Sequence, residues 1–334
     1  MERILEVNDL HVTFSTYGGT VQAVRGVNFH LDKGETLAIV GESGCGKSVT
    51  SNAIMRLIPD PPGKIAAGSI IFKGEDLATY SEKKMRSIRG VDISMIFQDP
   101  MTALNPTLTI GTQLVEGLKE HKKITGQKAK EKAIEMMNLV GIPNPEERLK
   151  QYPHQFSGGM RQRIVIAIAL ICDPDLLIAD EPTTALDVTI QAQILELFST
   201  IQERTGVSII LITHDLGVVA KIADRIVVMY AGKIIESGSK REIFYESRHP
   251  YTQGLLNSVP RLDAKGELKP IAGTPPDLFS PPKGCPFTAR CPFAMEVCDK
   301  VYPAPEKISD THHVDCWLQD ERAKRLLAAK SLQT

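Results

Sequence analysis

Residues 41–48, with the sequence GESGCGKS, fit the pattern G-x-x-x-x-G-K-[ST] of a phosphate-binding loop. Glycines in such a loop let backbone N–H groups curl around phosphate oxygens, and the helix that follows adds the positive end of its dipole. Lys47 is expected to reach the β- and γ-phosphates, and the Ser48 hydroxyl to bind Mg²⁺. The segment therefore predicts an ATP site. The residues expected to contact ATP are Gly41, Ser43, Gly44, Cys45, Gly46, Lys47, Ser48 and Val49.

A second segment, LLIADE at 176–181, suits the same chemistry. Its four apolar residues predict a buried strand, and two carboxylates follow at the end where open α/β sheets bind ligands. Asp180 is expected to hold Mg²⁺, directly or through water. Glu181 is expected to orient and polarise the attacking water, because phosphoryl transfer depends on positioning and charge stabilisation. His214 ends another apolar strand at 209–213 and is expected at the same sheet edge, where it would contact the γ-phosphate.

Alternating strand and helix patterns surround these segments. The chain begins with strand patterns at 4–14 and 21–31, and a helical block fills about 107–160. Strands and helices then alternate as far as a pair of hairpin-like strands at 225–238. Such alternation predicts a largely parallel sheet with helices on both faces, in which the helical block is an insertion.

Composition excludes some classes of function. The 39 Lys and Arg residues against 40 Asp and Glu give a formal net charge of -1, so no nucleic-acid partner is expected. No apolar run approaches the roughly 20 residues of a membrane-spanning helix. The N-terminal residues lack the apolar core of a signal peptide. We therefore expect a cytosolic chain, and a membrane role would require separate spanning subunits.

Ordered motifs along the chain resemble those of the ATP-binding cassette (ABC) ATPases. Residues 156–163, FSGGMRQR, resemble the ABC signature, which opens a helix before the LLIADE segment. The resemblance implies that Ser157, Gly158 and Gly159 bind the γ-phosphate of ATP held by another subunit, and small residues at a helix N-terminus suit an anion. Gln98 resembles the Q-loop residue, which senses the γ-phosphate and Mg²⁺ and faces the membrane subunits.

The same resemblance assigns three further positions. Asp187 resembles the D-loop aspartate, His214 resembles the switch histidine, and Phe14 is placed like the aromatic residue that stacks on adenine. The residues implied for catalysis are Glu181, His214 and Gln98, and those implied for Mg²⁺ are Ser48, Gln98 and Asp180.

Longer segments, including YPHQFSGGMRQR and RHPYTQGLLNSVPRLD, look like the D-type ATPase subunits of oligopeptide and dipeptide permeases, with features that favour the oligopeptide branch. The implied fold is α/β, a P-loop (RecA-like) core with an N-terminal antiparallel β subdomain and a helical subdomain inserted at about 100–165. The implied domains are an ABC ATPase domain at 1–262 and a small Cys-rich C-terminal domain at 263–334.

The resemblance also implies partners and a location. These are a homologous F-type ATPase subunit, two transmembrane permease subunits and an extracellular peptide-binding protein, with this chain at the cytoplasmic face of the membrane. The expected function is ATP hydrolysis that powers oligopeptide import. The alternative is the same role in a dipeptide, nickel or other small-ligand importer. An ABC ATPase without a transporter is disfavoured because the chain has neither a second cassette nor a heptad run. The intact motifs disfavour a regulator that does not hydrolyse ATP.

Four of the six cysteines, Cys285, Cys291, Cys298 and Cys316, crowd into the tail with the spacing C-x₅-C-x₆-C-x₁₇-C. Disulfides are disfavoured in a reducing cytosol, so metal ligation is one interpretation and four unconnected thiols are the other. Structural zinc usually shows closer cysteine pairs, although His312 and His313 lie near and could replace a thiolate. Four thiolates, with a proline after two of them, favour a structural [4Fe–4S] cluster, with Zn²⁺ as the alternative.

Overall fold

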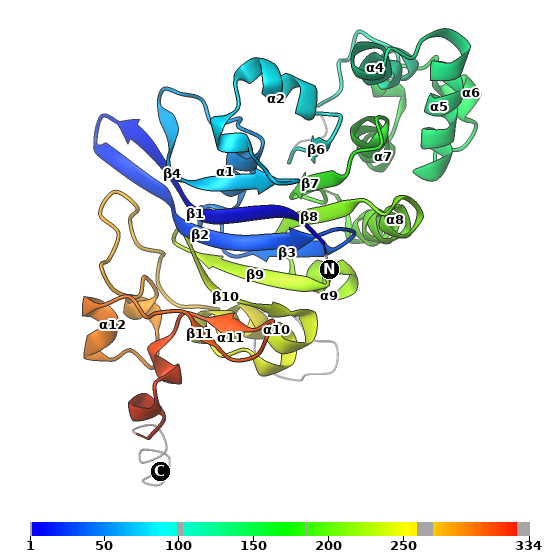
Figure 1. Ribbon diagram of the computed structural model, residues 1–334. Coiled ribbons are helices and arrows are strands. Elements are labelled where there is room, and N and C mark those ends of the chain that lie inside the picture. Colours follow the sequence, from blue (N-terminus) through cyan, green and yellow to red (C-terminus); the bar gives the residue numbers. More distant parts are fainter. Residues whose placement is uncertain (1, 99–102, 185, 259–269, 326–334) are drawn as a thin grey trace.

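The structure is a computed structural model that describes residues 2–98, 103–184, 186–258 and 270–325. In these residues the strands form two sheets, and Figure 1 shows the smaller one lying over the larger. The smaller sheet is antiparallel, with the order β2-β1-β4-β5. Its strands are β1 (Arg3–Thr16), β2 (Gly19–Asp32), β4 (Gly63–Phe72) and β5 (Glu75–Asp76).

The larger sheet has the order β11-β12-β10-β9-β3-β8-β7-β6 in the described residues. The strands from β9 to β6 in that order are parallel, and β10, β12 and β11 continue antiparallel beyond them. The strands are β3 (Thr36–Val40), β6 (Ile93–Ile96), β7 (Leu176–Asp180), β8 (Ser208–Thr213), β9 (Arg225–Tyr230), β10 (Lys233–Ser239), β11 (Glu306–Lys307) and β12 (His313–Val314).

Both faces of the parallel strands are buried, which is why β3, β7 and β8 are almost entirely apolar. Successive side chains point to opposite faces, so Leu177 and Ala179 pack in the cluster that contains the long helices. Leu176 and Ile178 pack in the cluster that contains the smaller sheet and the first helix. The expected mixed α/β fold with a largely parallel sheet is confirmed.

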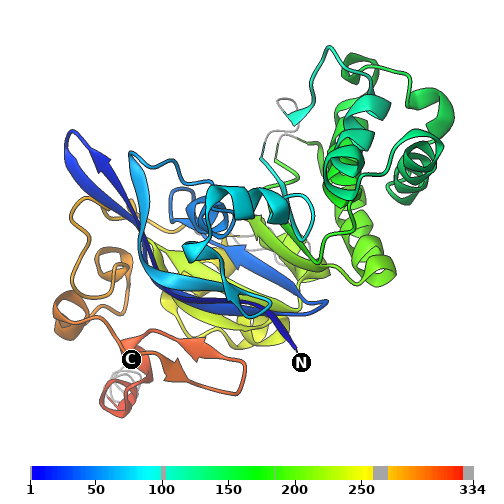
Figure 2. The same cartoon turned by 45° about the horizontal axis from the view of Figure 1, so that its top comes forward.

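The helices fall into groups that Figures 1 and 2 separate clearly. Between β6 and β7 the chain forms a helical group that lies on the far side of the molecule from β11 and β12. Its members are α4 (Ile110–Gly117), a π-helical turn (Leu118–Lys122), α5 (Gly126–Leu139), α6 (Pro145–Arg148) and α7 (Gly158–Leu170). The other described helices are α1 (Lys47–Ile54), α2 (Glu82–Ile88), α8 (Val188–Thr205), α9 (Leu216–Ile222), α10 (Lys240–Glu246), α11 (Pro250–Asn257) and α12 (Glu296–Lys300).

The C-terminal segment packs into the core of the rest of the chain. Its strand β12 pairs with β10, with Val314 opposite Glu236 and His313 opposite Ser237. Cys285 and Phe287 pack with residues of β3 and β9 in a third apolar cluster. The predicted boundary at 262/263 lies outside the described residues. None of the helices in the described ranges combines the length and apolar character needed to cross a membrane.

Candidate functional site

The loop between β3 and α1 is shaped by glycines that no other residue can replace. Gly41 has φ +154°, and a Cβ atom there would lie 2.2 Å from the carbonyl oxygen of Met229. Gly46 has φ +103°, and its Cβ would lie 2.5 Å from the carbonyl oxygen of Ala23. The loop therefore packs directly on the backbones of β9 and β2, which fixes its curl.

Lys47 begins α1 and points back into the loop. Its Nζ donates hydrogen bonds to the carbonyl oxygens of Gly41, at 2.8 Å, and Glu42, at 2.9 Å. The neighbouring Ser48 hydroxyl donates to Oδ1 of Asp180, the last residue of β7, at 3.0 Å. Burial raises the pKa of the Asp180 carboxyl, and the hydrogen bond from Ser48 opposes that rise. An ammonium, a hydroxyl and a carboxylate thus meet at one strand edge.

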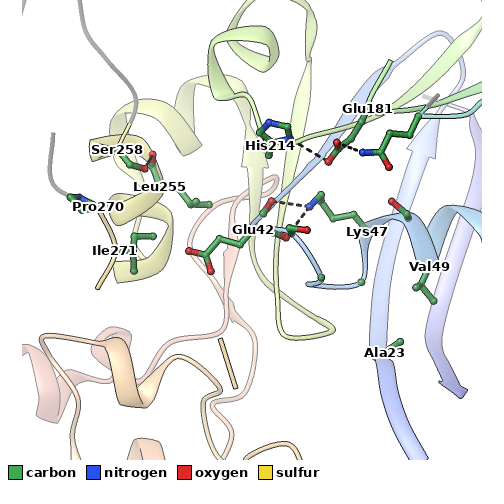
Figure 3. Close-up of a pocket in the computed structure, with 16 residues that line it drawn as sticks. Ala23, Glu42, Lys47, Val49, Glu181, His214, Leu255, Ser258, Pro270 and Ile271 are labelled. Carbon is green, nitrogen blue, oxygen red and sulfur yellow. Dashed lines mark hydrogen bonds and ion pairs between the residues drawn. The ribbon is translucent and has the colours of Figure 1, made fainter. Parts of the chain in front are cut away.

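Glu181 is the centre of a second cluster beside the loop (Figure 3). Its Oε2 accepts hydrogen bonds from Gln98 Nε2, at 2.9 Å, and Thr184 Oγ1, at 3.0 Å. His214 Nδ1 lies 3.3 Å from its Oε1. The backbone of Glu181 is left-handed, with φ +47°, and its N–H donates to the carbonyl oxygen of Ile212 on β8. Such a backbone costs about 1 kcal/mol or more outside glycine, and the contacts around Glu181 hold it there.

The strand register explains why these residues meet. Val40 of β3 lies opposite Thr213 of β8, and Asp180 of β7 lies opposite Ile212. The carboxyl ends of three parallel strands therefore come together, and the residue after each strand reaches one cavity. The sequence prediction that His214 lies at the same edge as Lys47 and Glu181 is confirmed.

A cavity of about 680 Å³ lies over this edge, lined by most of the glycine-rich loop together with Gln98, Glu181 and His214. Four residues from the C-terminal third also line it, namely Leu255, Ser258, Pro270 and Ile271, which Figure 3 shows opposite Glu181. These four and Ala23 were missed from the sequence, where nothing indicates that they approach the loop. Glu42 was missed although it belongs to the loop, because it stands at a position where the loop pattern accepts any residue. Cys45, expected at the nucleotide, is buried in the apolar cluster beneath the loop.

Phe14 lies apart from this cavity. Its ring packs on Gly63, where a Cβ atom would lie only 2.6 Å from Cε1 of the ring. It contacts the apolar cluster of the smaller sheet and is not among the described residues that line the cavity.

The signature-like residues form a separate surface site at the start of α7. The Ser157 hydroxyl caps that helix by accepting a hydrogen bond from the Met160 N–H, and Asp187 caps α8 by accepting from the Ile190 N–H at 2.9 Å. A Cβ atom on Gly159 would lie 2.8 Å from Ile190, so the two helix starts are neighbours. Among the described residues, these do not line the cavity around Lys47.

The four tail cysteines lie within electrostatic reach of one another. Burial, chiefly, raises the pKa of Cys316 to about 12, and the other three thiols add to the rise. Burial likewise raises the pKa of Cys285 to about 11. Yet the described residues contain no set of three or more His, Cys, Asp or Glu side chains placed to hold a metal ion, so the predicted cluster is not supported.

His312, one of the two histidines that could replace a thiolate, contacts a carboxylate, and its role at a metal stays a prediction. Its Nε2 lies 2.8 Å from Glu236 Oε1, and both side chains are almost fully buried. The ring is therefore engaged by a carboxylate on β10. Glu236 in turn accepts hydrogen bonds from the N–H groups of Arg248 and His249.

These features together define the class of ATP-binding cassettes. They are a phosphate-binding loop, a carboxylate pair at the ends of parallel strands, and a signature-like helix start on another surface. The ABC transporter family model matches residues 24–184, and the model for the oligopeptide/dipeptide transporter C-terminal region matches 235–298. The dipeptide transport ATP-binding protein DppD of Bacillus subtilis (strain 168) is 69% identical, over 97% of this chain and 97% of its own. The oligopeptide transport ATP-binding protein OppD of the same strain is 62% identical, over 95% of this chain and 89% of its own.

Solved structures agree with this class. The dimeric post-hydrolysis state of the ATP-binding cassette MJ0796, bound to ADP and Pi, superposes with a TM-score of 0.63 and 26% identity, covering 71% of this chain and 99% of that one. CbiO1 from Clostridium perfringens gives the same TM-score at 29% identity, covering 74% and 92%. The chain therefore belongs to the ABC transporter family, in its oligopeptide/dipeptide branch, and is an ATPase.

Proposed function

We propose that this chain binds and hydrolyses ATP to drive the import of peptides through an ABC transporter. The observation that carries the proposal is the match of residues 235–298 to the C-terminal region of oligopeptide/dipeptide transporters, attached to an ATPase site. Relatives named for dipeptide and for oligopeptide transport both match across most of the chain. The preference for oligopeptides over dipeptides remains a prediction. The alternative, import of nickel or another small ligand, is not favoured by these relatives.

Within this function, Lys47 binds the β- and γ-phosphates, and it exchanges the carbonyl oxygens of Gly41 and Glu42 for phosphate oxygens when ATP enters. The other loop residues donate backbone N–H groups. Ser48 and Asp180, already 3.0 Å apart, together with the Gln98 amide oxygen, would hold Mg²⁺, which prefers oxygen ligands. Bound there, Mg²⁺ would neutralise charge that develops on the phosphates.

Glu181 orients the attacking water, and Gln98 and His214 hold its carboxylate in place through the contacts at 2.9 and 3.3 Å. These contacts leave His214 exposed on the cavity side, where it can reach the γ-phosphate. The chemistry asked of the protein is positioning and charge stabilisation.

Ser157, Gly158 and Gly159 act on ATP held by a second ATPase subunit, with Asp187 at the same interface. Their surface position at the start of α7, outside the cavity around Lys47, supports this role. We assign adenine stacking to Phe14, and its ring would have to meet the base from its place beside Gly63. These roles make the isolated chain a poor ATPase.

The complex proposed around the chain contains two transmembrane permease subunits, an extracellular peptide-binding protein and a homologous F-type ATPase subunit. The chain lies at the cytoplasmic face of the membrane. Its ATPase domain spans 1–262, with a helical subdomain at about 100–165 that includes α4–α7, and its C-terminal domain spans 263–334. The helical group lies apart from the C-terminal segment in both views, which leaves separate surfaces for separate partners (Figures 1 and 2).

Genetic replacement in the chain's own host tests this function. Cells that lack the chain are expected to lose uptake of labelled di- and oligopeptides, while uptake of free amino acids stays unchanged. Wild-type chain should restore uptake, and Lys47→Ala should not, because Lys47 is central to nucleotide binding. Undiminished peptide uptake in the deletion strain, or loss of nickel uptake in its place, would contradict the proposal.

The second part of the proposal concerns Cys285, Cys291, Cys298 and Cys316, which we assign to a structural [4Fe–4S] cluster, with Zn²⁺ as the alternative. The support is the number and type of the ligands, three of which, Cys285, Cys291 and Cys298, pack in or against one apolar cluster. A metal centre would cross-link a segment that has few aliphatic residues of its own.

Anaerobic purification decides the identity of this centre. The full chain is expected to be brown, to contain iron and sulfide, and to bleach with dithionite. Cys291→Ser should lose the colour. Cys172→Ser should keep it, because Cys172 is a buried cysteine distant in sequence from the four tail cysteines. Colourless protein with stoichiometric zinc would establish the alternative. Metal-free protein with an unchanged melting temperature would reject both.

A further inference from the structure

Arg290, in the C-terminal segment immediately before Cys291, reaches the glycine-rich loop. Its guanidinium forms a bidentate ion pair with Glu42, the second residue of that loop: Nη1 donates to Oε2 at 2.6 Å and Nη2 to Oε1 at 2.9 Å. The two residues are 248 positions apart in the sequence. This fork geometry is specific to arginine, because lysine cannot offer two parallel donors.

All five N–H donors of this guanidinium are used. Besides Glu42, Nη1 donates to the Tyr230 hydroxyl at 3.1 Å, Nη2 to the Ile271 carbonyl at 3.1 Å, and Nε to the Ala272 carbonyl at 2.9 Å. The Arg290 side chain is only 5% exposed. Because a guanidinium stays protonated in proteins, the charge of Arg290 is permanent. Arg290 is therefore a fixed cation beside the loop.

Glu42 is held on both its side chain and its backbone. Its N–H donates to the Tyr251 hydroxyl at 2.9 Å, and its carbonyl oxygen accepts from Lys47 Nζ at the same distance. Figure 3 shows it between Lys47 and the C-terminal residues Leu255 and Ile271. A change in the Glu42 side chain is thus transmitted directly to the lysine that binds phosphate.

The charge of Glu42 poses a problem for an anion site. Its carboxylate is 27% exposed and lines the same cavity as Lys47 and Ser48. Left unpaired, a carboxylate that lines this cavity would repel the phosphates of a nucleotide. Arg290 cancels that charge and draws the carboxylate towards the C-terminal segment.

We propose that Arg290 is a positioning residue of the nucleotide site, which neutralises Glu42 and fixes the loop, so that the C-terminal segment is a working part of nucleotide binding. The proposal rests on ATP binding at Lys47. It gives the C-terminal segment a role in nucleotide binding that is separate from the proposed metal binding by its cysteines. Arg290 also donates to the carbonyl of Ile271, which lines the same cavity. The Arg290 side chain therefore holds two parts of the cavity lining, the loop at Glu42 and the segment at Ile271.

A double-mutant cycle tests the proposal through equilibrium binding of a fluorescent ATP analogue to the full chain. Arg290→Met is expected to raise the dissociation constant about tenfold, on the scale of losing one partner of a close charge pair. Glu42→Gln alone should weaken binding less than Arg290→Met does, because the amide oxygen can still accept from Arg290 and no unpaired carboxylate remains. The Arg290→Met/Glu42→Gln chain should regain most of the lost affinity. In the assembled transporter, Arg290→Met should raise KM for ATP and leave kcat nearly unchanged.

Three controls distinguish an effect of Arg290 on nucleotide affinity from a general loss of folded protein. Arg322→Met removes an exposed arginine of the same segment, paired only locally with Asp320, and should leave affinity unchanged. Melting temperatures identify any variant that fails to fold, and Arg290→Lys, which keeps the charge without the fork, should fall between wild type and Arg290→Met. Unchanged affinity in Arg290→Met, or a double variant as weak as Arg290→Met, overturns the proposal. If the wild-type chain binds no ATP, or if Lys47→Ala binds ATP as tightly as the wild type, the ATP site at Lys47 is itself refuted, which is a different outcome from failure of the Arg290 proposal.

Discussion

Replacing Glu181 by glutamine is expected to leave ATP binding intact and to lower the rate of hydrolysis about a thousandfold, roughly 4 kcal/mol in the barrier. Glutamine keeps the shape of the side chain but removes the negative charge that polarises water. The contacts from Gln98, Thr184 and His214 show that the carboxylate is held in one orientation before ATP arrives. The measurement is ATP turnover by the assembled transporter, with the partner subunit's site inactivated.

Glu203→Gln provides the matched control, because Glu203 is an exposed carboxylate on α8. It should hydrolyse ATP at the wild-type rate. If Glu181→Gln also kept near-normal turnover under these conditions, Glu181 would not be the residue that orients water. Trapped ATP in the Glu181→Gln complex, detected after removal of free nucleotide, would show that binding survives.

Replacing Lys47 by alanine should instead abolish tight nucleotide binding, with an expected rise of about 100-fold in the dissociation constant for ATP. The ammonium is buried, and its present partners are two carbonyl oxygens that phosphate oxygens would replace. Two charge-assisted hydrogen bonds of about 1.5 kcal/mol each account for a change of that size. Titration of the purified chain with a fluorescent ATP analogue measures it.

Lys33→Ala is the control for this change, since Lys33 is an exposed lysine in the turn between β2 and β3. It should bind ATP like the wild type. A Lys47→Ala chain with wild-type affinity would show that the nucleotide binds elsewhere.

Much of the catalytic site could be predicted because its residues follow strands. The patterns before Gly41, Asp180 and His214 are short apolar runs, which form buried parallel strands, and the carboxyl ends of such strands share one edge. Once these segments are recognised as parallel strands, the residues that follow them are expected at one edge of the sheet. The same local signals placed α5, α7, α8 and the β9–β10 hairpin.

The C-terminal contributions could not be predicted because they depend on contacts between distant segments. Strands β11 and β12 have two residues each, too few for any periodicity to appear. Arg290 and Glu42 are ordinary charged residues, and their partnership exists only in the folded chain. Phe14 is a different case, because its position along the chain suggests contact with the nucleotide while its ring packs on Gly63, so its role stays a prediction.

The pairing of β12 with β10 has a consequence for the order of events during synthesis. On the ribosome, Lys233–Ser239 emerges well before His313–Val314, so β10 presents an open edge until the tail has been translated. Unpaired edges invite association with other nascent chains. The tail therefore covers this edge only after it has been translated, and Arg290 reaches the glycine-rich loop at the same late stage. If Arg290 positions that loop as we propose, the chain is expected to reach its full affinity for nucleotide only near the end of translation.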